Sequence, residues 1–348
     1  MIKTVFGLKG KKRSVDRKLI LDVGTQYVKV LDLTVKKGVA TLHNYKILNL
    51  ISGGRRFVSK EIAKIIKKAI LDMKIGGNLA YASVSGKTTI VRFADMPKMS
   101  KKELKNSLKY QTDLRLPFSL DEALYDCQII DQNSSVEGRM KVVVAAVPKK
   151  DANKVLDIIQ AANLICMKVD VDAIALANSF LWGQSKDDKE AYALVNIGAS
   201  RTNLTIMENG APVLCRELNH GGISLTEAIS HKLEINFDDA EERKIKSDAQ
   251  VLAIVEDELK PISTGIQQSF DYYEGSSSSH ISKVYLSGGG AQTRGIIDYL
   301  MSMLNRTVLL WNPLRSINID SFPDKELLQA NAPLLTIALG IGLGDNAK

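Results

Sequence analysis

Cysteine and histidine are scarce in this 348-residue sequence, and neither is arranged as a disulfide framework or a metal site would require. The three cysteines, Cys127, Cys166 and Cys215, are odd in number and widely separated. The four histidines lack the regular spacing of zinc ligands. These absences exclude a disulfide-rich secreted domain and a histidine–cysteine metal centre, and they indicate a reducing, cytoplasmic environment.

Long apolar runs are also missing. A run such as VVVAAV, which starts at Val142, is far shorter than the roughly 20 residues of a membrane-spanning helix. The first residues have neither an apolar core nor a small-residue cleavage site, so we expect no signal peptide. Hydrophobic residues make up 45% of the chain and charged residues 25%, which is typical of globular proteins. The length favours two or more domains with a cleft between them.

Most of the excess positive charge lies at one end of the chain. The formal net charge is +8, and residues 1–18 carry seven lysines and arginines against the single acid Asp16. A nearly neutral body, without a cationic face interleaved with aromatic residues, argues against nucleic-acid binding. Two interpretations of the basic tail stay open: a solvated, frayed terminus, or a segment in peripheral contact with anionic lipid.

The first part of the chain alternates strands with a helix. Strand patterns cover residues 19–23, 27–33 and 39–48, with VKKG as the turn between the last two. A helix follows in SKEIAKIIKKAILDMKI, with Ser59 as its N-cap and its apolar residues on one face, and LAYASVSG returns as a strand. This order predicts the beginning of an α/β layer.

Residues 88–164 break that rhythm and predict a separate small module, which we call the insert. Its expected order is strand, helix, strand, strand, helix, in the segments TTIVRFADMP, SKKELKNSLKYQTDLRLPF, ALYDCQIID, MKVVVAAVP and KKDANKVLDIIQAANL. Beyond it, a hairpin is expected in YALVNIGASRTNLTIM and a helical stretch from FDDAEERKIK to about Glu274. The sequence ISKVYLSGGGAQTRGIIDYLMSML predicts a strand, a glycine loop and a helix, and NAPLLTIALGIGLG predicts a closing apolar helix.

Two hairpin tips repeat each other along the chain. LILDVGTQYVKV places Asp22, Gly24 and Thr25 at its turn, and 174 positions later VNIGASRTNLTI places Asn196 and Gly198 at the equivalent positions. A tight loop closed by glycine lets backbone N–H groups approach a phosphate without a Cβ in the way. A third loop, SGGG at 287–290, stands between a strand and a helix, where free amides favour anions.

This arrangement resembles the actin-like ATPase superfamily. LDVGTQYVKV is similar to its first phosphate loop, VNIGASRTNLTI to its second, VYLSGGGAQTRGI to its adenosine motif, and AEERK to the Glu-x-x-Lys segment beside the nucleoside. The resemblance implies ATP or ADP as ligand with magnesium near Asp22 and Asn196, held through water. It implies these nucleotide-binding residues: Asp22, Gly24, Thr25, Lys29, Asn196, Gly198, Ala199, Ser200, Thr202, Gly221, Gly222, Glu241, Lys244, Ser287, Gly288, Gly289 and Gly290.

The same resemblance implies an α/β actin-like ATPase fold of two duplicated ribonuclease-H-like halves. The first half would contain residues 19–87 and 165–185 with the C-terminal helix 331–345, after a basic N-terminal tail at 1–18. The second half would span 186–330 and include a helical subdomain on the nucleotide side at about 223–280. The insert, 88–164, would be an SHS2-like α+β subdomain of the kind found in the FtsA and PilM branch.

Within that branch the insert resembles the type IV pilus assembly PilM family, on the segment VRFADMPKMSKKELKNSLKYQTDLRLPFSLDEALYDCQII. KVDVDAIALANSF and LLTIALGIGLG are similar to the same family. The resemblance implies a cytoplasmic scaffold, peripheral at the inner membrane, whose partner is the N-terminal cytoplasmic peptide of a PilN-like membrane protein. The peptide would lie in a groove between the insert and the first half. Contacts with other pilus motor components and homo-oligomerisation stay open.

Asn196 departs from the superfamily, which usually has an aspartate at the second phosphate loop. An amide brings no charge to a magnesium site, and no glutamine or glutamate near the tips is evidently placed to orient water. We therefore expect nucleotide binding with slow or absent hydrolysis, and leave the catalytic residues unassigned. We also expect Gly289→Val to abolish binding, because a β-branched residue blocks close approach and resists positive φ.

Two alternative functions come from the same superfamily. A small-molecule kinase is disfavoured because no aspartate is placed as an evident base for a substrate hydroxyl. An FtsA-like division protein would end in an amphipathic membrane helix, which is not found in this sequence, whose last residues are GDNAK.

For several charged residues, two interpretations of their role stay open. Lys29 either reaches a phosphate or covers the solvent side of its strand. Asp170 and Asp172 are expected to end a strand that faces the cleft, with or without a catalytic role. One stripe of lysines is either a solvated face or a docking surface for an acidic partner: Lys98, Lys102, Lys105 and Lys109.

Overall fold

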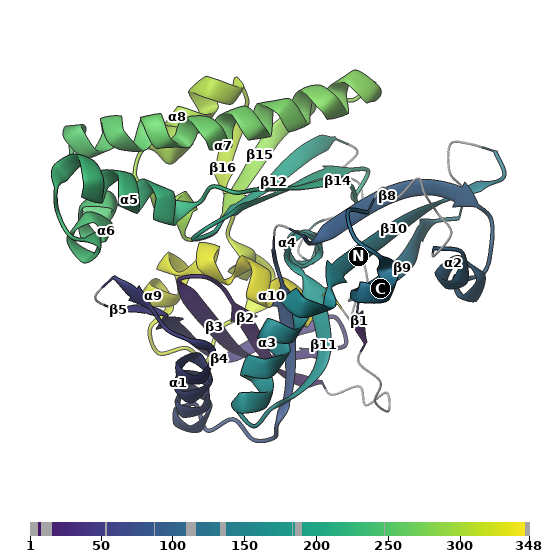
Figure 1. The fold of residues 1–348 in the computed structure, drawn as a ribbon, viewed down its shortest axis with the longest axis horizontal. Coiled ribbons are helices and arrows are strands. Elements are labelled where there is room, and N and C mark those ends of the chain that lie inside the picture. The colour runs from purple at the N-terminus through teal and green to yellow at the C-terminus, as the bar shows by residue number, and fades with distance from the viewer. Residues whose placement is uncertain are drawn as a thin grey trace.

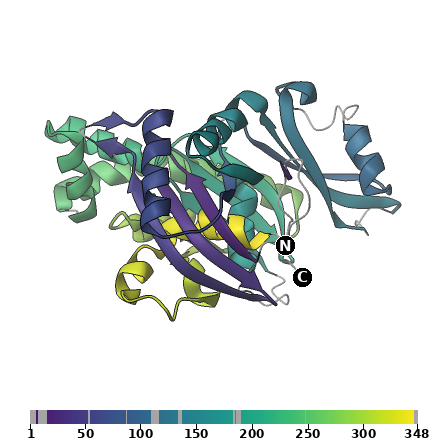
Figure 2. The same ribbon diagram turned by 90° about the horizontal axis from the view of Figure 1, so that it is seen from below.

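The structure, a computed structural model, describes residues 6–7, 16–52, 54–86, 88–108, 116–132, 137–182, 184, 190–246 and 248–344. It consists of two sheets with helices between and around them, and a smaller sheet that projects to one side (Figures 1 and 2). Most of the basic tail, and the expected boundary between the halves at 185–186, lie outside the described residues.

The first half is built on a seven-stranded sheet with the order β1-β11-β7-β2-β3-β4-β17. Its strands are β1 (Phe6–Gly7), β2 (Arg17–Val23), β3 (Tyr27–Lys36), β4 (Val39–Asn49), β7 (Leu79–Val84), β11 (Ile165–Val171) and β17 (Ile317–Asn318). A short hairpin, β5 (Ile51–Ser52) with β6 (Arg55–Arg56), precedes helix α1 (Ser59–Asp72). Val58, not the expected Ser59, is the N-cap of α1.

Alternating side chains of β2 serve two different cores. Leu19 and Leu21 pack against α1 and α3 (Lys149–Ala161) on one face. Ile20, on the opposite face, packs against α4 (Asp172–Leu181) and α10 (Thr336–Leu343). A strand buried on both faces reads as a nearly continuous apolar run, which explains the sequence LILDV. The carboxyl ends of β2, β7 and β11 therefore lie at one edge of the sheet.

The second half repeats this plan with a five-stranded sheet of order β14-β13-β12-β15-β16. Its strands are β12 (Ala191–Ile197), β13 (Thr202–Glu208), β14 (Ala211–Leu218), β15 (Ile281–Ser287) and β16 (Thr307–Leu310). Its helices are α5 (Gly222–Leu233), α6 (Phe237–Lys246), α7 (Ala249–Ser276) and α8 (Ile296–Leu304). After β16 the chain returns to the first sheet, where β17 pairs with β4, and α9 (Lys325–Ala330) follows β17. As in the first half, an antiparallel hairpin is followed by a parallel strand, here β15 beside β12. Two sheets built on the same plan are what the predicted duplication into two halves implies.

Helices α4 and α10 fill the space between the two sheets (Figure 1). They cross so closely that a Cβ on Gly340 would lie 1.8 Å from the carbonyl oxygen of Ala175. Only glycine allows this approach. The small residues of the closing segment NAPLLTIALGIGLG are therefore needed for packing, as the sequence predicts.

The insert has a three-stranded sheet with the order β8-β10-β9 and, in the residues that the structure describes, two α-helices. Its elements are β8 (Ile90–Pro97), α2 (Lys101–Ser107), β9 (Ala123–Asp131), β10 (Arg139–Pro148) and then α3. α3 packs on the sheet of the first half, where Ile158 and Ile159 join its core. The part of the insert that stands outside the first half is therefore the small sheet with α2.

The described part of the basic tail packs against the protein, and the described lysines of the stripe are exposed. Lys18 is buried, and its ammonium group donates a hydrogen bond of 2.7 Å to the carbonyl oxygen of Gly342. Phe6–Gly7 forms a strand that pairs with β11. In the stripe, Lys98, Lys102 and Lys105 are exposed, while Lys109 lies outside the described residues.

Candidate nucleotide-binding site

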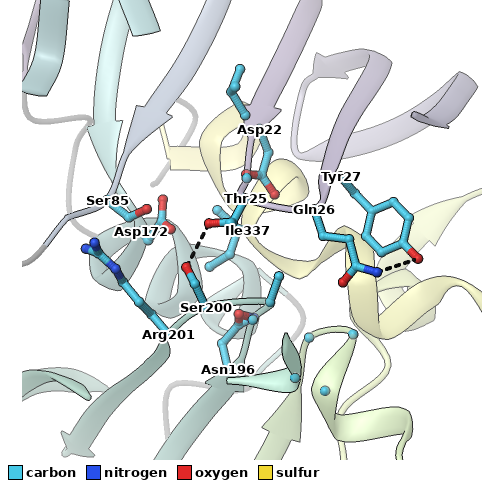
Figure 3. A pocket seen from close by; sticks show the side chains of 18 of the residues that line it. Asp22, Thr25, Gln26, Tyr27, Ser85, Asp172, Asn196, Ser200, Arg201 and Ile337 are labelled. Carbon is cyan, nitrogen blue, oxygen red and sulfur yellow. Dashed lines mark hydrogen bonds between the residues drawn. The ribbon is translucent and has the colours of Figure 1, made fainter. Parts of the chain in front are cut away.

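A cavity of about 850 Å³ lies between the two halves. It opens at the carboxyl ends of β2, β7 and β11 from the first sheet and of β12 and β15 from the second (Figure 3). Ligands of open α/β sheets bind at this edge, where the loops after the strands present backbone groups. The volume is within the range of small-molecule sites.

Most of the residues predicted to bind nucleotide line this one cavity. They are Asp22, Gly24, Thr25, Lys29, Asn196, Gly198, Ala199, Ser200, Gly222, Glu241, Lys244, Gly288, Gly289 and Gly290. Segments separated by more than two hundred residues in the sequence are thus brought together by the fold.

Three predicted residues do not line the cavity. Thr202 is fully buried, and its hydroxyl donates to the carbonyl oxygen of His220 at 2.9 Å. Ser287 is also buried, with its hydroxyl toward the carbonyl oxygen of Val195. A Cβ on Gly221 would lie 2.6 Å from the carbonyl oxygen of Gly198. These residues support the loops from behind, so we correct their direct role in ligand contact.

The second phosphate loop is held by the first turn of α5. The amide of Gly222 donates to the carbonyl oxygen of Gly198 at 2.9 Å, and the amide of Ile223 donates to that of Ala199 at 2.7 Å. The first N–H groups of a helix have no partner within the helix. Here they fix the loop, whose side chains are left to face the cavity.

The two hairpin tips touch each other. The hydroxyls of Thr25 and Ser200 lie 2.7 Å apart and share one hydrogen bond across the cavity (Figure 3). A phosphate group is a strong hydrogen-bond acceptor and can replace this contact with one bond to each hydroxyl. The hydroxyl pair therefore marks where the two halves can grip an anion together.

Asp22 and Asn196 project from the two tips as predicted, but Asp22 already has a cationic partner. Lys29 lies 3.0 Å from its carboxylate, and both side chains are largely buried. No group of three metal-ligating side chains occurs among the described residues. A magnesium ion here would take most of its ligands from water and phosphate oxygens, as Mg²⁺ commonly does. Lys29 borders the cavity, and could also reach an anion.

Glu241 and Lys244 form the opposite wall of the cavity on α6. The ammonium group of Lys244 donates to the carboxylate of Glu241 at 2.7 Å, to the hydroxyl of Thr226 at 2.7 Å and to the carbonyl of Gly222 at 3.1 Å. Burial lowers the pKa of Lys244, and Glu241 opposes this effect. The pair is therefore a rigid polar wall suited to contact the hydroxyls or base of a nucleoside.

The three glycines of the SGGG loop have different roles. Gly288 has a φ of +91°, and a Cβ there would lie 2.3 Å from the carbonyl oxygen of Ile197. Gly290 packs equally closely against the side chain of Ile197. Gly289 has a φ of −66° and only Leu334 near it, at 3.8 Å. The expected positive φ at Gly289 is wrong; that backbone requirement belongs to Gly288.

Several cavity residues were not predicted, and two of them lie at the first tip. Gln26 donates to the hydroxyl of Tyr27 at 3.3 Å, and both side chains lie at one end of the cavity (Figure 3). Burial, with a smaller effect of Glu241, raises the pKa of Tyr27. Gln26 is the glutamine near a tip that the sequence analysis did not recognise. Its position directly after Thr25 was the available signal.

The other end of the cavity contains Ser85, Asp172 and Arg201 (Figure 3). Burial, and then the charge of Asp22, raises the pKa of Asp172 to about 7. Asp172 lines the cleft, as expected, and can exchange a proton near neutral pH, whereas the same expectation for Asp170 is wrong. Asp170 is fully buried and does not line the cavity.

The insert also contributes to the cavity wall. Thr88, Lys150, Asp151 and Lys154 line it, and the hydroxyl of Thr88 donates to the carboxylate of Asp151 at 2.7 Å. Arg56, from the β5–β6 hairpin, donates to the carbonyl of Gly24 at 3.3 Å. These basic residues had no motif around them in the sequence, because only the fold brings them to the first phosphate loop.

A family model described as type IV pilus assembly protein PilM matches residues 21–345. The chain belongs to the type IV pilus assembly protein PilM family. The match extends over both halves, the insert and the loops around the cavity.

Solved structures confirm the predicted fold class of this PilM-family chain, an actin-like ATPase fold. A chain of a PilM–PilN type IV pilus biogenesis complex superposes with a TM-score of 0.84 at 22% identity, covering 96% of this chain and 99% of that one. The ethanolamine utilization protein EutJ of Carboxydothermus hydrogenoformans gives 0.57 at 15% identity, covering 98% and 92%. MreB5 of Spiroplasma citri, bound to ADP, gives 0.54 at 11% identity, covering 94% and 95%. Among the described residues, no helix has the length and apolarity to cross a membrane.

The raised pKa of Asp172 predicts a pH-dependent stability. The unfolded chain releases this proton near pH 4 and the folded chain near pH 7, so wild-type stability falls as the pH rises between them. Asp172→Asn should therefore raise the free energy of unfolding at pH 8, where the wild-type carboxylate is charged, and change it little at pH 4. We expect an increase of about 1–2 kcal/mol at pH 8, less than the full pKa shift would give, because the side chain is partly exposed and solvent screens its charge. Urea denaturation at both pH values measures this.

Asp157→Asn is the control for that experiment, because it removes the same charge at an exposed position of α3. Its effect should be small and similar at both pH values. An Asp172→Asn variant that gains no stability at pH 8 relative to pH 4 would contradict the assignment.

Proposed function

We propose that this protein is a nucleotide-binding scaffold of a type IV pilus assembly machine, docked to the cytoplasmic tail of a PilN-like inner-membrane protein. The observation that carries the nucleotide part is the cavity bounded by both hairpin tips and the SGGG loop. Family membership and the fold shared with a PilM–PilN complex support the pilus part.

The charged side chains of the cavity, and the backbone N–H groups of its glycine loops, suit an adenine nucleotide whose phosphates lie between the two hairpin tips. The hydroxyls of Thr25 and Ser200, which bond each other in this structure, would each donate a hydrogen bond to a phosphate oxygen instead. The cations Lys29 and Arg201 line the same cavity. Glu241 and Lys244 would hold the nucleoside at the other end. MreB5 of Spiroplasma citri, which has the same fold, is bound to ADP in one structure and AMPPNP in another. A bound magnesium ion would neutralise phosphate charge near Asp22 and Asn196.

Slow turnover follows from the charges that would surround a metal ion. Phosphoryl transfer depends chiefly on positioning and electrostatic stabilisation. Asn196 supplies no charge, and Asp22 is paired with Lys29. We therefore propose that nucleotide binding, rather than rapid hydrolysis, is the main activity of the cavity.

The partner proposal rests on the insert. Its outer strand β9 is an edge of the small sheet, and β1 packs beside β9 at the edge of the first half. An extended peptide can add a strand at such an edge and place alternate side chains in pockets. A PilN-like tail bound there would hold the protein at the inner membrane without a spanning helix of its own.

Adenine nucleotides should bind saturably, and Gly289→Val should weaken this binding by about tenfold or more, because its side chain would fill space beside Leu334 in the cavity wall. Calorimetry with ATP and ADP, with and without magnesium, measures both. Gly275→Val, at an exposed helical position with nothing near it, is the matched control. Wild-type protein that binds neither nucleotide at millimolar concentration would refute the proposal, and unchanged binding by Gly289→Val would refute the placement.

Hydrolysis by the wild-type protein should be slower than about 1 s⁻¹, the low end of kinase rates. Asn196→Asp should raise magnesium affinity in the presence of ADP, because it adds a carboxylate opposite Asp22. Asn203→Asp is the control, since Asn203 also lines the cavity and pairs directly with Asn196 in the sheet. Equal gains in both variants would mean that added charge, and not the position, controls metal binding.

The partner site is best mapped on the whole chain. Deleting 88–164 would remove α3, whose Ile158 and Ile159 belong to the core of the first half. Instead, a photo-crosslinking peptide with the N-terminal cytoplasmic sequence of the PilN-like protein from the same genome should bind and crosslink to the insert and the first half. A scrambled peptide is the control. Crosslinks confined to residues 190–246 and 248–304, in the second half, would contradict this placement.

A further inference from the structure

The insert contacts both halves of the molecule. One apolar cluster joins Val91 and Val143 of the insert to Val171 and Ile174 of the first half, and Cys215 of the second half packs against it. Strand β8 lies beside β14 (Figure 1), with Arg92 of β8 close enough to influence the pKa of Cys215. A change in how the two halves face each other therefore cannot leave the insert undisturbed.

The insert also meets the first half at the cavity itself. β7 ends at Val84, and the next residues, Ser85 and Gly86, line the cavity before the chain reaches β8. The return connection brings Asp151 to the same wall, where Thr88 binds it. Both connections of the insert thus border the end of the cavity that holds Asp172 and Arg201.

Glu217, on β14, links this connection to the second phosphate loop. Its carboxylate accepts a hydrogen bond of 2.8 Å from the guanidinium of Arg201 and another from the backbone amide of Gly86. Its side chain is 14% exposed and does not itself line the cavity. One buried carboxylate therefore joins Arg201, beside Ser200, to Gly86 in the segment that leads from β7 into the insert.

That carboxylate depends on Arg201. Burial raises the pKa of Glu217, and Arg201 is the charge that opposes this rise. A buried carboxylate that loses its cation is strongly destabilised. Arg201, in turn, lines the cavity, and a planar guanidinium binds phosphate as readily as carboxylate. A phosphate at this end of the cavity would compete with Glu217 for the same group.

We propose that Glu217 is a positioning residue that couples nucleotide occupancy to the insert: the terminal phosphate of a nucleoside triphosphate takes Arg201 from Glu217, and the Gly86 connection is released. The coupling rests on the proposed nucleotide binding. A nucleoside diphosphate, held at its nucleoside end by Glu241 and Lys244, is one phosphate shorter and does not reach Arg201. The Arg201–Glu217 pair then stays in place. The insert, with the partner surface proposed for it, thereby distinguishes triphosphate from diphosphate.

Hydrogen exchange, measured by mass spectrometry on the whole chain, tests the coupling. Amides of Gly86 and β8 should exchange about tenfold faster with a non-hydrolysable ATP analogue than with ADP, because a charge-assisted hydrogen bond is lost. In Glu217→Gln, exchange there should already be fast without nucleotide, and the difference between analogue and ADP should disappear. Calorimetry on the same samples should give an ADP affinity close to wild type, since Glu217 lies outside the cavity, and a tighter affinity for the analogue, since its terminal phosphate no longer competes with a carboxylate for Arg201.

Glu274→Gln is the matched control. Glu274 is similarly buried, pairs with Arg306 and accepts a backbone N–H from Ile281, but it is remote from the cavity. It should keep the wild-type difference between the two nucleotides. Nucleotides that bind wild type but give equal exchange, or a Glu217→Gln variant that keeps the difference, would overturn the coupling alone. Failure of wild type to bind either nucleotide would overturn the proposed function and the coupling with it.

Discussion

The close crossing of α4 and α10 determines how the two sheets face each other, and the cavity depends on that geometry. The two helices are shared by both sheets, and at Gly340 the backbones approach so closely that no side chain fits between them. Lys18 adds a polar tie from β2 to the last turn of α10, where carbonyl groups favour a cation. With the sheets fixed by a rigid pair of helices, the loops at their carboxyl ends meet at hydrogen-bonding distance, as the hydroxyls of Thr25 and Ser200 do.

Three ion pairs lie in or beside the cavity before any ligand arrives. Lys29 neutralises Asp22, Lys244 neutralises Glu241, and Arg201 neutralises Glu217. Pairing lowers the cost of burying these groups, but it also means that an anion must exchange partners with them to bind. Ligand binding in such a site is an exchange of ion pairs, so a ligand can alter the positions of groups that it does not touch.

The sequence was enough to predict the fold, through its resemblance to a known superfamily, and the glycine loops that border the cavity, because glycine turns and apolar strands have strong local signals. The equivalence of Gly24 and Gly198 located both tips, and the SGGG loop located the third wall. Thr202, Gly221 and Ser287 were assigned to the site with the motifs that contain or adjoin them. The hydroxyls of Thr202 and Ser287 instead point into the protein, and Gly221 packs against the backbone of Gly198. Gly289 was credited with the positive φ of Gly288, because adjacent glycines cannot be told apart without backbone angles. Arg56 and Lys150 belong to no motif, and their relation to the cavity arises only from tertiary packing. Arg201 lies within VNIGASRTNLTI, but nothing in that segment distinguished it from its neighbours as a cavity residue.

The point at which the insert joins the chain explains why this module, the proposed partner surface, shares a wall with the candidate nucleotide cavity. It leaves the first half directly after β7, whose carboxyl end lies beside that of β2 and its tip. Any module placed at this point must begin at the phosphate end of the cleft. Packing of β8 against β14 then gives the module a second contact, on the opposite half. A rigid body attached to both sides of a cleft responds to changes in the cleft that a body attached to one side would not detect. The location of the insert, more than its internal fold, is therefore what would allow the proposed partner and the proposed nucleotide to influence each other.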